Sequence, residues 1–564
     1  MTARPPAPPA ALAVRLALAV VVGGAALAGC GTPGGAATAD VAADARPAPP
    51  ATRAERTDYR ETSTYADVAA FLAALDGRGG VTVSAFGEGA EGRPLPLAVW
   101  GAPSSSAAAV RATGKTRVLV VATIHGGEVA GKEAALMVLR DLAAGRHDDW
   151  ADSLVVLVAP LYNADGNERV AHDNRPLQLG PVGGMGERAN AQGLDLNRDF
   201  VKLASPEARA LVGLLRDADP HVVLDLHTTN GTLMGYDLTY APPLSPATPP
   251  GVDRELWDRW LPAVTGALRA RYDLETWHYG NVPGAFGEAA TAPRGWYSFS
   301  PQPRFSTNYV GLRGRFGILS EAYSYAPFAE RVASTKRFVE EAVDYAARHA
   351  SRLRAIAEAA DRERVVGTEV PLRADFAALP EPATVLLGEA DTVAHPVTGA
   401  PMLRRRDVRR PETMPAFVRF AATETTVAPD RYVVRGEHKE AVRALLDAHG
   451  IAYAEELVWG VAREAFRVDS VRQAERPFQG VRVSEVWGRW EPVPPEAGPM
   501  PRLAPSLVVP VDQPLGRLAV ALLEPRSDDG VVAWGVVPAE AWAPGQTGPI
   551  QRVPAGGGGA GEGP

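Results

Sequence analysis

Cysteine is nearly absent from this chain of 564 residues, which contains only Cys30. A single cysteine cannot form a disulfide within the chain, so packing must supply the stability of the folded protein. The chain also lacks a G-x-S-x-G segment, which carries the nucleophilic serine of α/β hydrolases. The sequence therefore does not indicate a serine nucleophile of this kind.

A basic excess is missing as well. Charged residues make up 22% of the chain, the formal net charge is −8 and the isoelectric point is about 5.8. No long run of like charge occurs. Nucleic-acid binding normally requires a basic surface, so we exclude a nucleic-acid partner.

The N-terminal apolar run is too short for a membrane span. Residues 16–27 (LALAVVVGGAAL) instead have the length of a signal-peptide core, with Arg15 before them. The following Leu27-Ala28-Gly29-Cys30 resembles the lipobox of bacterial lipoproteins, in which the cysteine is lipidated. We expect residues 1–30 to be a lipoprotein signal peptide and the mature protein to be exported and membrane-anchored, in the periplasm or at the cell surface. The alternatives are an ordinary secretory signal with an incidental cysteine, or a short anchor helix.

The remaining length suggests several folded units, at about 100–200 residues each. Residues 31–57 are rich in Gly, Ala, Pro and Thr, as flexible linkers are. Strand-like and helical patterns alternate over residues 58–362, which indicates an α/β catalytic domain. Residues 366–545 combine Pro-rich connections with short β-like runs, which indicates a smaller accessory domain of α+β or β-rich type. We expect residues 546–564 to be a disordered tail.

Hydrophobic periodicity places individual elements in both regions. In the first region the expected strands are 81–86, 95–100, 117–124, 154–159, 221–226 and 315–319, and the expected helices are 130–142, 206–215 after an N-cap at Ser205, and 328–362. In the second region the expected strands are 384–387, 417–421, 506–511 and 518–523, and the expected helix is 439–449.

The segment VATIHGGEVAGKE, residues 121–133, allows two interpretations. Seven positions from Gly126 to Lys132 match a phosphate-binding P-loop, but Glu133 stands where a hydroxyl must bind magnesium. A carboxylate there would repel phosphate. A metal site is the better interpretation, because His125 and Glu128 have i, i+3 spacing at the start of a helix and can converge on one ion.

A third metal ligand is available at the end of another strand. The run HVVLDLH ends in His227. Ligands of open α/β sheets bind beyond the carboxyl ends of the strands, and His125 and His227 both lie at such ends. Two imidazoles and one carboxylate would leave a fourth position for water, as in catalytic zinc sites. A histidine at a strand end, taken alone, more often caps or packs.

Two further segments carry polar groups suited to a catalytic site. Asn197 and Arg198 offer an amide and a guanidinium that can grip a carboxylate, and Asp195 can orient a metal-bound histidine. The apolar run RFGILSE, residues 315–321, is expected to be a strand that ends in Glu321. Partial burial would raise the pKa of this carboxyl toward neutrality, so that it could accept a proton from water. It could equally be a surface residue after an edge strand.

Five segments in one order resemble the zinc carboxypeptidase family over about residues 58–360: HxxE at 125–128, NADG at 163–166, DLNR at 195–198, DLH at 225–227 and SEAY at 320–323. The resemblance implies a mixed sheet flanked by helices, one zinc ion and hydrolysis of C-terminal peptide bonds. It also implies that zinc is held by His125, Glu128 and His227.

The resemblance implies roles for the other residues too. Asn197 and Arg198 would bind the C-terminal carboxylate of a peptide, Glu321 would be the general acid and base, and Asp195 would support a zinc-bound histidine. The family also uses an arginine to polarise the scissile carbonyl, worth about 10²–10³ in turnover. We favour Arg188 for this role over Arg175.

Several aromatic and basic residues near the expected site have more than one candidate role. We favour Tyr309 over Tyr297 as the tyrosine that caps a bound substrate. Trp277, Tyr279 and Trp296 either pack in the core or form a substrate wall. Arg304, Arg313 and Arg315 precede Glu321 in the region that shapes the specificity pocket, where they could favour acidic side chains.

Three alternative functions fit part of the same pattern. A related deacylase would cleave N-acyl amino acids, but the Asn197-Arg198 pair favours a peptidase. An endopeptidase or amidase of cell-wall peptides could use the same residues. A lipid-anchored binding protein without catalysis would be expected to have lost Glu321 or a metal ligand, and all of them are present.

Overall fold

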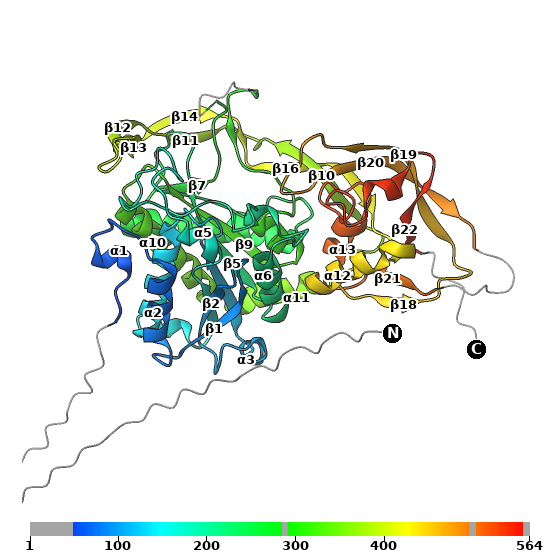
Figure 1. The fold of residues 1–564 in the computed structure, drawn as a ribbon, viewed down its shortest axis with the longest axis horizontal. Coiled ribbons are helices and arrows are strands. Elements are labelled where there is room, and N and C mark those ends of the chain that lie inside the picture. The colour runs from blue at the N-terminus through cyan, green and yellow to red at the C-terminus, as the bar shows by residue number, and fades with distance from the viewer. Residues whose placement is uncertain (1–48, 285–290, 496–503, 557–564) are drawn as a thin grey trace, which may run out of the picture. The chain divides into compact units, whose positions relative to one another are not determined.

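Eight strands form the sheet of the first region, in the order β1-β2-β4-β3-β5-β9-β6-β7 (Figure 1). The computed structural model describes residues 49–284, 291–495 and 504–556. The expected signal peptide with Cys30 lies outside these residues. The strands are β1 (Val81–Glu88), β2 (Pro94–Trp100), β3 (Thr116–Ala122), β4 (Leu154–Ala159), β5 (Val222–Thr229), β6 (Leu238–Ala241), β7 (Thr276–His278) and β9 (Phe316–Tyr323).

Strands β4, β3, β5 and β9 run parallel in the middle of the sheet, whereas β2 and β6 join it antiparallel. The middle strands are apolar because both faces are covered. Within β3, Val120 packs in a cluster with Leu136, whereas Val121 packs in a second cluster with Leu211 on the opposite face. The predicted α/β class with a mixed sheet is therefore confirmed.

Eleven α-helices accompany this sheet in the described residues: α1 (Arg53–Arg56), α2 (Tyr65–Leu75), α3 (Ala107–Ala112), α4 (Ala130–Ala143), α5 (Ala164–Glu168), α6 (Pro206–Asp217), α7 (Pro250–Glu255), α8 (Leu261–Tyr272), α9 (Ser306–Leu312), α10 (Phe328–Arg348) and α11 (Ala350–Asp361). Ser205 caps α6 as predicted, since its hydroxyl accepts a hydrogen bond from the Ala208 amide. The helix predicted over 328–362 is broken at His349, whose backbone (φ −118°, ψ 17°) is not helical. Neither proline nor glycine marks this break in the sequence.

The carboxyl ends of β3, β5 and β9 meet at one edge of the sheet because these strands are parallel neighbours. His227 of β5 stands opposite Glu321 of β9 in the register. His125 follows β3 by three residues. The side chains predicted to act together are thus brought to the same edge.

The second region combines two-stranded ladders with a six-stranded sheet of order β18-β21-β17-β22-β19-β20. The ladders pair β10 (Glu369–Ala377) with β16 (Arg419–Val427), β11 (Ala383–Leu387) with β14 (Arg410–Met414), and β12 (Ala390–Ala394) with β13 (Pro401–Arg405), while β15 (Ala416–Phe417) pairs with β8 (Trp296–Tyr297). The six-stranded sheet contains β17 (Arg431–Val434), β18 (Ala454–Glu456), β19 (Arg463–Gln473), β20 (Ser484–Val493), β21 (Ser506–Pro510) and β22 (Thr547–Val553), with α12 (Lys439–His449) and α13 (Gly516–Leu523) beside it.

Three predictions are corrected here. Residues 518–523 belong to helix α13 rather than a strand, because a short fully apolar run fits either element. Residues 547–553 of the expected tail form β22, which pairs with β17 and β19 and buries Ile550. Residues 53–56 of the expected linker form α1, whose Glu55 pairs with Arg140 at 2.7 Å.

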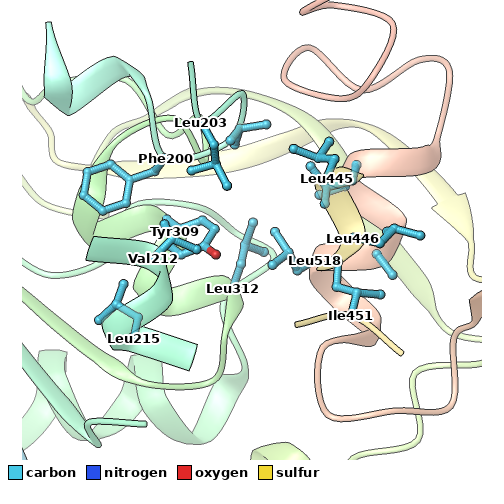
Figure 2. Close-up of a cluster of buried hydrophobic side chains, with 14 of the residues drawn as sticks. Phe200, Leu203, Val212, Leu215, Tyr309, Leu312, Leu445, Leu446, Ile451 and Leu518 are labelled. Atoms are coloured by element: carbon cyan, nitrogen blue, oxygen red, sulfur yellow. The ribbon is translucent and has the colours of Figure 1, made fainter. Parts of the chain in front are cut away.

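One of the hydrophobic clusters extends from the first region into the second (Figure 2). Side chains from both meet in a continuous cluster, which includes Phe200, Leu203, Val212, Leu215, Tyr309 and Leu312 from the first region and Leu445, Leu446, Ile451 and Leu518 from the second. An apolar contact of this kind holds domains in a fixed arrangement, whereas small polar contacts permit motion.

A buried polar network lies inside this shared core. The Tyr309 hydroxyl lies 2.7 Å from Nδ1 of His449, and Nε2 of His449 donates to the Val201 carbonyl at 3.0 Å. Arg313 donates to the His449 carbonyl at 3.0 Å. With Nε2 as donor and Nδ1 as acceptor, the imidazole is neutral. Burial lowers the pKa of His449 to about 3, with Arg313 adding to the effect and the Val201 carbonyl opposing it.

We predict that His449 makes the protein less stable in acid. A histidine in the unfolded chain has a pKa of about 6.5. Between that pH and about 3, the unfolded state therefore binds a proton at His449 that the folded state does not bind. The free energy of unfolding therefore falls as the pH drops from about 6.5 toward 3, by up to ~1.4 kcal/mol per pH unit for this residue. Urea unfolding at several pH values should show a shallower slope in His449→Gln than in the parent chain.

The partly buried His438, just before α12, provides the control. His438→Gln should leave the pH slope unchanged. An equal slope in His449→Gln and the parent would contradict the proposed neutral state.

Candidate metal centre and substrate site

Three buried side chains converge at the carboxyl edge of the sheet. His125, Glu128 and His227 are 3%, 3% and 1% exposed, and their candidate ligand atoms all lie within 4.8 Å of one another. The convergence follows from the fold, since β3 and β5 are hydrogen-bonded parallel neighbours and α4 begins directly after Glu128. These three residues could hold one metal ion.

The two imidazoles are oriented as metal ligands require. Nδ1 of each ring faces the Glu128 carboxylate, at 2.8 Å for His125 and 2.9 Å for His227. Each Nε2 lies against a second carboxylate, at 3.0 Å from Asp195 and 2.9 Å from Asp225. A carboxylate that accepts the outer N–H fixes the ring and increases its basicity toward a metal.

Asp195 was predicted for this supporting position, but Asp225 was not. The D-L-H spacing contained the signal, because residues two apart in a strand point to the same face. Asp225 precedes His227 by two positions in β5, so its carboxylate can reach the imidazole along the strand. It also accepts a hydrogen bond from the Ser306 hydroxyl.

The charge balance of the cluster suits a divalent cation. Burial raises the pKa of Glu128, but His125 and Arg175 outweigh it, so the pKa lies well below the usual value and the group is a carboxylate. For His227, burial opposes protonation, yet Asp225 and Glu128 raise the pKa well above its usual value. Metal binding must displace the proton of His227, so the metal affinity should rise with pH. Two nitrogen donors and one carboxylate match the preferences of zinc.

A cavity of ≈ 120 Å³ opens over the three residues. Its walls include the other predicted polar residues except Asp195, as well as three aromatic side chains. The residues that line it are His125, Glu128, Arg175, Arg188, Asn197, Arg198, His227, Thr228, Thr229, Asn230, Tyr279, Phe299, Phe305, Ser306, Thr307, Leu319 and Glu321. Tyr279 therefore lines this cavity, whereas Trp296 is fully buried and packs.

Both candidate arginines reach the cavity, in different environments. Arg188 binds Oδ2 of Asp195 through Nε and Nη2, at 3.1 and 2.8 Å, and its side chain stays 44% exposed. Arg175 is buried and donates to Glu128 at 3.0 Å. Arg188 is therefore better placed to meet a substrate, while Arg175 compensates the charge of Glu128.

Asn197 and Arg198 lie in a short 3₁₀ turn (Leu196–Arg198) that Asp195 caps. The Asn197 side-chain oxygen accepts from the Ser306 amide at 2.9 Å. The Arg198 guanidinium lies 4.0 Å from the centre of the Phe305 ring. The turn presents an amide and a cation to the same cavity as the metal cluster.

Glu321 faces the cavity from β9. Its Oε2 is buried and has no hydrogen-bond partner within the described ranges. Burial raises the pKa of Glu321 to about 8, with Glu128 and Asp225 adding to the effect and His227 and Arg188 opposing it. A bound cation would lower this pKa again, toward the range of a general base at neutral pH.

Several sequence predictions are not supported by these positions. Tyr309 is 0% exposed and hydrogen-bonded in the shared core, so it cannot cap a substrate from there. Tyr297 stacks on Phe417 at 4.3 Å and does not line the cavity. The three arginines predicted near the specificity pocket, Arg304, Arg313 and Arg315, are instead bound to Asp529, His449 and Asp361.

Comparison with known proteins agrees with this geometry. Residues 69–300 match the family model described as zinc carboxypeptidase. The matched segment is similar to zinc carboxypeptidases. Carboxypeptidase 2 of Trichophyton rubrum is 35% identical over 158 residues, which are 27% of this chain and 26% of that protein. Carboxypeptidase D of Mus musculus is 33% identical over 157 residues, 23% of this chain and 11% of that protein.

The chain spans only about a quarter, or less, of the length of these curated relatives. Among solved structures, a metallo-carboxypeptidase from Burkholderia cenocepacia aligns with 50% of this chain and 69% of its own length, at 18% identity and a TM-score of 0.36.

We predict that Asp225→Asn weakens zinc binding by about 10–100-fold, because the His227 imidazole loses the carboxylate that orients it. Competition with a chromophoric chelator measures the affinity without any substrate. Asp217→Asn, at an exposed position of α6, should bind zinc like the parent. Equal affinity in the Asp225 and Asp217 variants would contradict the supporting role of Asp225.

Proposed function

We propose that this protein is a zinc-dependent carboxypeptidase that hydrolyses peptide bonds and releases C-terminal residues. One observation carries the proposal: the His125-Glu128-His227 cluster shares a single cavity with Arg198 and with Glu321. A metal cluster, a carboxylate-binding cation and a proton acceptor are the three parts that such a reaction requires.

Zinc held by the three side chains would supply Lewis acidity, which lowers the pKa of a water molecule and polarises a carbonyl oxygen. Glu321 is the proton carrier in this scheme. Its buried Oε2 can take a proton from the attacking water and then give it to the leaving amine. No covalent link between enzyme and substrate is needed.

The cationic residues orient the peptide. Arg198 and Asn197 would bind the terminal carboxylate, since guanidinium and carboxylate groups form paired, charge-assisted hydrogen bonds. Arg188 stands between this turn and the metal cluster, with Nη1 3.4 Å from Nδ1 of His125. From there it can donate to the carbonyl oxygen as negative charge develops on it.

Digestion of a peptide library tests the proposal. The chain lacking residues 1–30 should shorten peptides progressively from the C-terminus, and a chelator should stop the reaction. Glu321→Gln should lower kcat by about 10²–10⁴ and still bind zinc, since a neutral amide cannot accept the proton. Mass spectrometry follows the products, and Glu358→Gln, exposed on α11, serves as the control.

The product pattern separates the alternatives. Internal cuts would identify an endopeptidase or amidase, and release of acyl groups alone would identify a deacylase. Zinc-independent products, or full activity in Glu321→Gln, would contradict the mechanism.

We also propose that the mature protein is exported and attached to a membrane through a lipid on Cys30. The support comes from the sequence, where the apolar run 16–27 precedes Leu27-Ala28-Gly29-Cys30. No helix in the described parts of the chain is long and apolar enough to span a bilayer. A lipid on the N-terminal cysteine would supply the attachment, together with a second membrane signal where one chain is too weak.

Labelling with a fatty-acid analogue tests this attachment. The full chain produced in a bacterial host should incorporate the label and sediment with membranes, because acyl groups are transferred to Cys30. Cys30→Ala should lose the label. Label retained in Cys30→Ala, or an unlabelled parent chain, would refute lipidation at this residue.

A further inference from the structure

One hairpin of the second region reaches the substrate site. Strands β19 and β20 continue past their ends, since the Ala474 amide donates to the Val483 carbonyl at 2.8 Å. Phe478 and Val481 then exchange backbone hydrogen bonds of 2.8 and 3.0 Å. Gln479 and Gly480 therefore form a two-residue turn at the tip of the hairpin.

The tip contacts the residue that organises the metal and substrate groups. The Asp195 amide donates to Oε1 of Gln479 at 2.8 Å, across 284 positions of sequence. The Asp195 side chain holds His125 and Arg188, and it accepts from the Asn197 amide at 2.9 Å. A side chain from the second region thus fixes the backbone where the turn of Asn197 and Arg198 begins.

The conformation of Gln479 points to a selected function. Its φ is +51° and that of Gly480 is +77°, so both residues are left-handed, as in a type I′ turn. Asn-Gly and Gly-Gly are the pairs that suit such a turn, because other side chains are strained there. Strained residues of this kind cluster at functional sites. The side chain of Gln479 accepts the hydrogen bond from the Asp195 amide in this conformation.

The tip contacts the first region through Arg304. Phe478 stacks on Trp534, with ring centres 6.2 Å apart, and the Arg304 guanidinium lies over both rings at 5.6 and 4.9 Å. Arg304 in turn pairs with the buried Asp529 at 3.0 Å, and it adjoins Phe305 of the cavity wall. Arg304 thereby links the hairpin tip to the wall of the cavity.

We propose that Gln479 is a positioning residue for the carboxylate-binding turn. It holds the first amide of the turn, while Ser306 holds Asn197 from the opposite side. Asn197 and Arg198 are thereby kept at a fixed place relative to the metal cluster. The second region is then a functional part of the substrate site for peptides with a free C-terminal carboxylate, a statement that rests on the proposed function.

Gln479→Gly isolates this contact, because glycine accepts the left-handed backbone and removes only the side chain. For a blocked dipeptide with a free carboxylate, we expect KM to rise about five- to tenfold, as for the loss of one hydrogen bond. We expect kcat to change by less than about twofold, since Glu321 and the metal ligands are untouched. Zinc content should stay the same, and the urea midpoint should stay the same or rise.

Gln479→Glu keeps an acceptor oxygen at the same distance from the backbone, so its KM should stay close to that of the parent chain. Glu475→Ala, exposed on the same hairpin, should behave like the parent. An unchanged KM in Gln479→Gly, or a loss of zinc and kcat instead, would overturn the positioning role.

Hydrogen exchange gives a readout independent of catalysis. Amides of residues 190–200 should exchange faster in Gln479→Gly, whereas those of the sheet should not change. Equal exchange in the parent and the variant would overturn the proposal even if KM changed. If the parent chain cleaved no peptide at all, the proposed function would fail, and the exchange measurement would still decide whether Gln479 holds the turn.

Discussion

The carboxylate of Glu128 between two imidazoles is the interaction on which the site depends. Each oxygen faces one histidine, at 2.8 and 2.9 Å, and the Thr228 amide donates to one of them at 3.0 Å. A buried carboxylate in this position is costly unless cations or hydrogen-bond donors compensate it. Arg175 does so from outside the triad, at 3.0 Å. The three buried side chains are therefore arranged as ligands for one positive ion.

The rest of the first region keeps this cluster in register. Parallel pairing sets β3 beside β5 and β5 beside β9, so that His227 and Glu321 stand in adjacent strands. Asp195 and Asp225 then hold the outer nitrogens of the rings. Gly126 shows how little freedom remains, since a Cβ there would lie 2.4 Å from the Gly166 carbonyl carbon and 2.5 Å from the Glu187 carbonyl oxygen. A side chain at this position would displace the loop that carries His125.

The sequence was sufficient for the features that local chemistry determines. Apolar runs ending in His227 and Glu321, and the turn after β3, are visible as patterns with one physical reason each. The position of Tyr309 was not predictable, because only tertiary packing brings His449 to its hydroxyl. The same limit applies to Gln479, whose partner Asp195 is 284 positions away. The strand β22 was missed because its partners β17 and β19, rather than its own polar composition, stabilise it.

The central claim is that one zinc ion binds between His125, Glu128 and His227, with Glu321 facing it. Anomalous diffraction at the zinc absorption edge, from crystals of the zinc-loaded chain, tests it most directly. We expect a single strong peak per chain, within bonding distance of both Nδ1 atoms and the Glu128 carboxylate. A peak bound only by other residues, or no peak at stoichiometric zinc, would contradict the account.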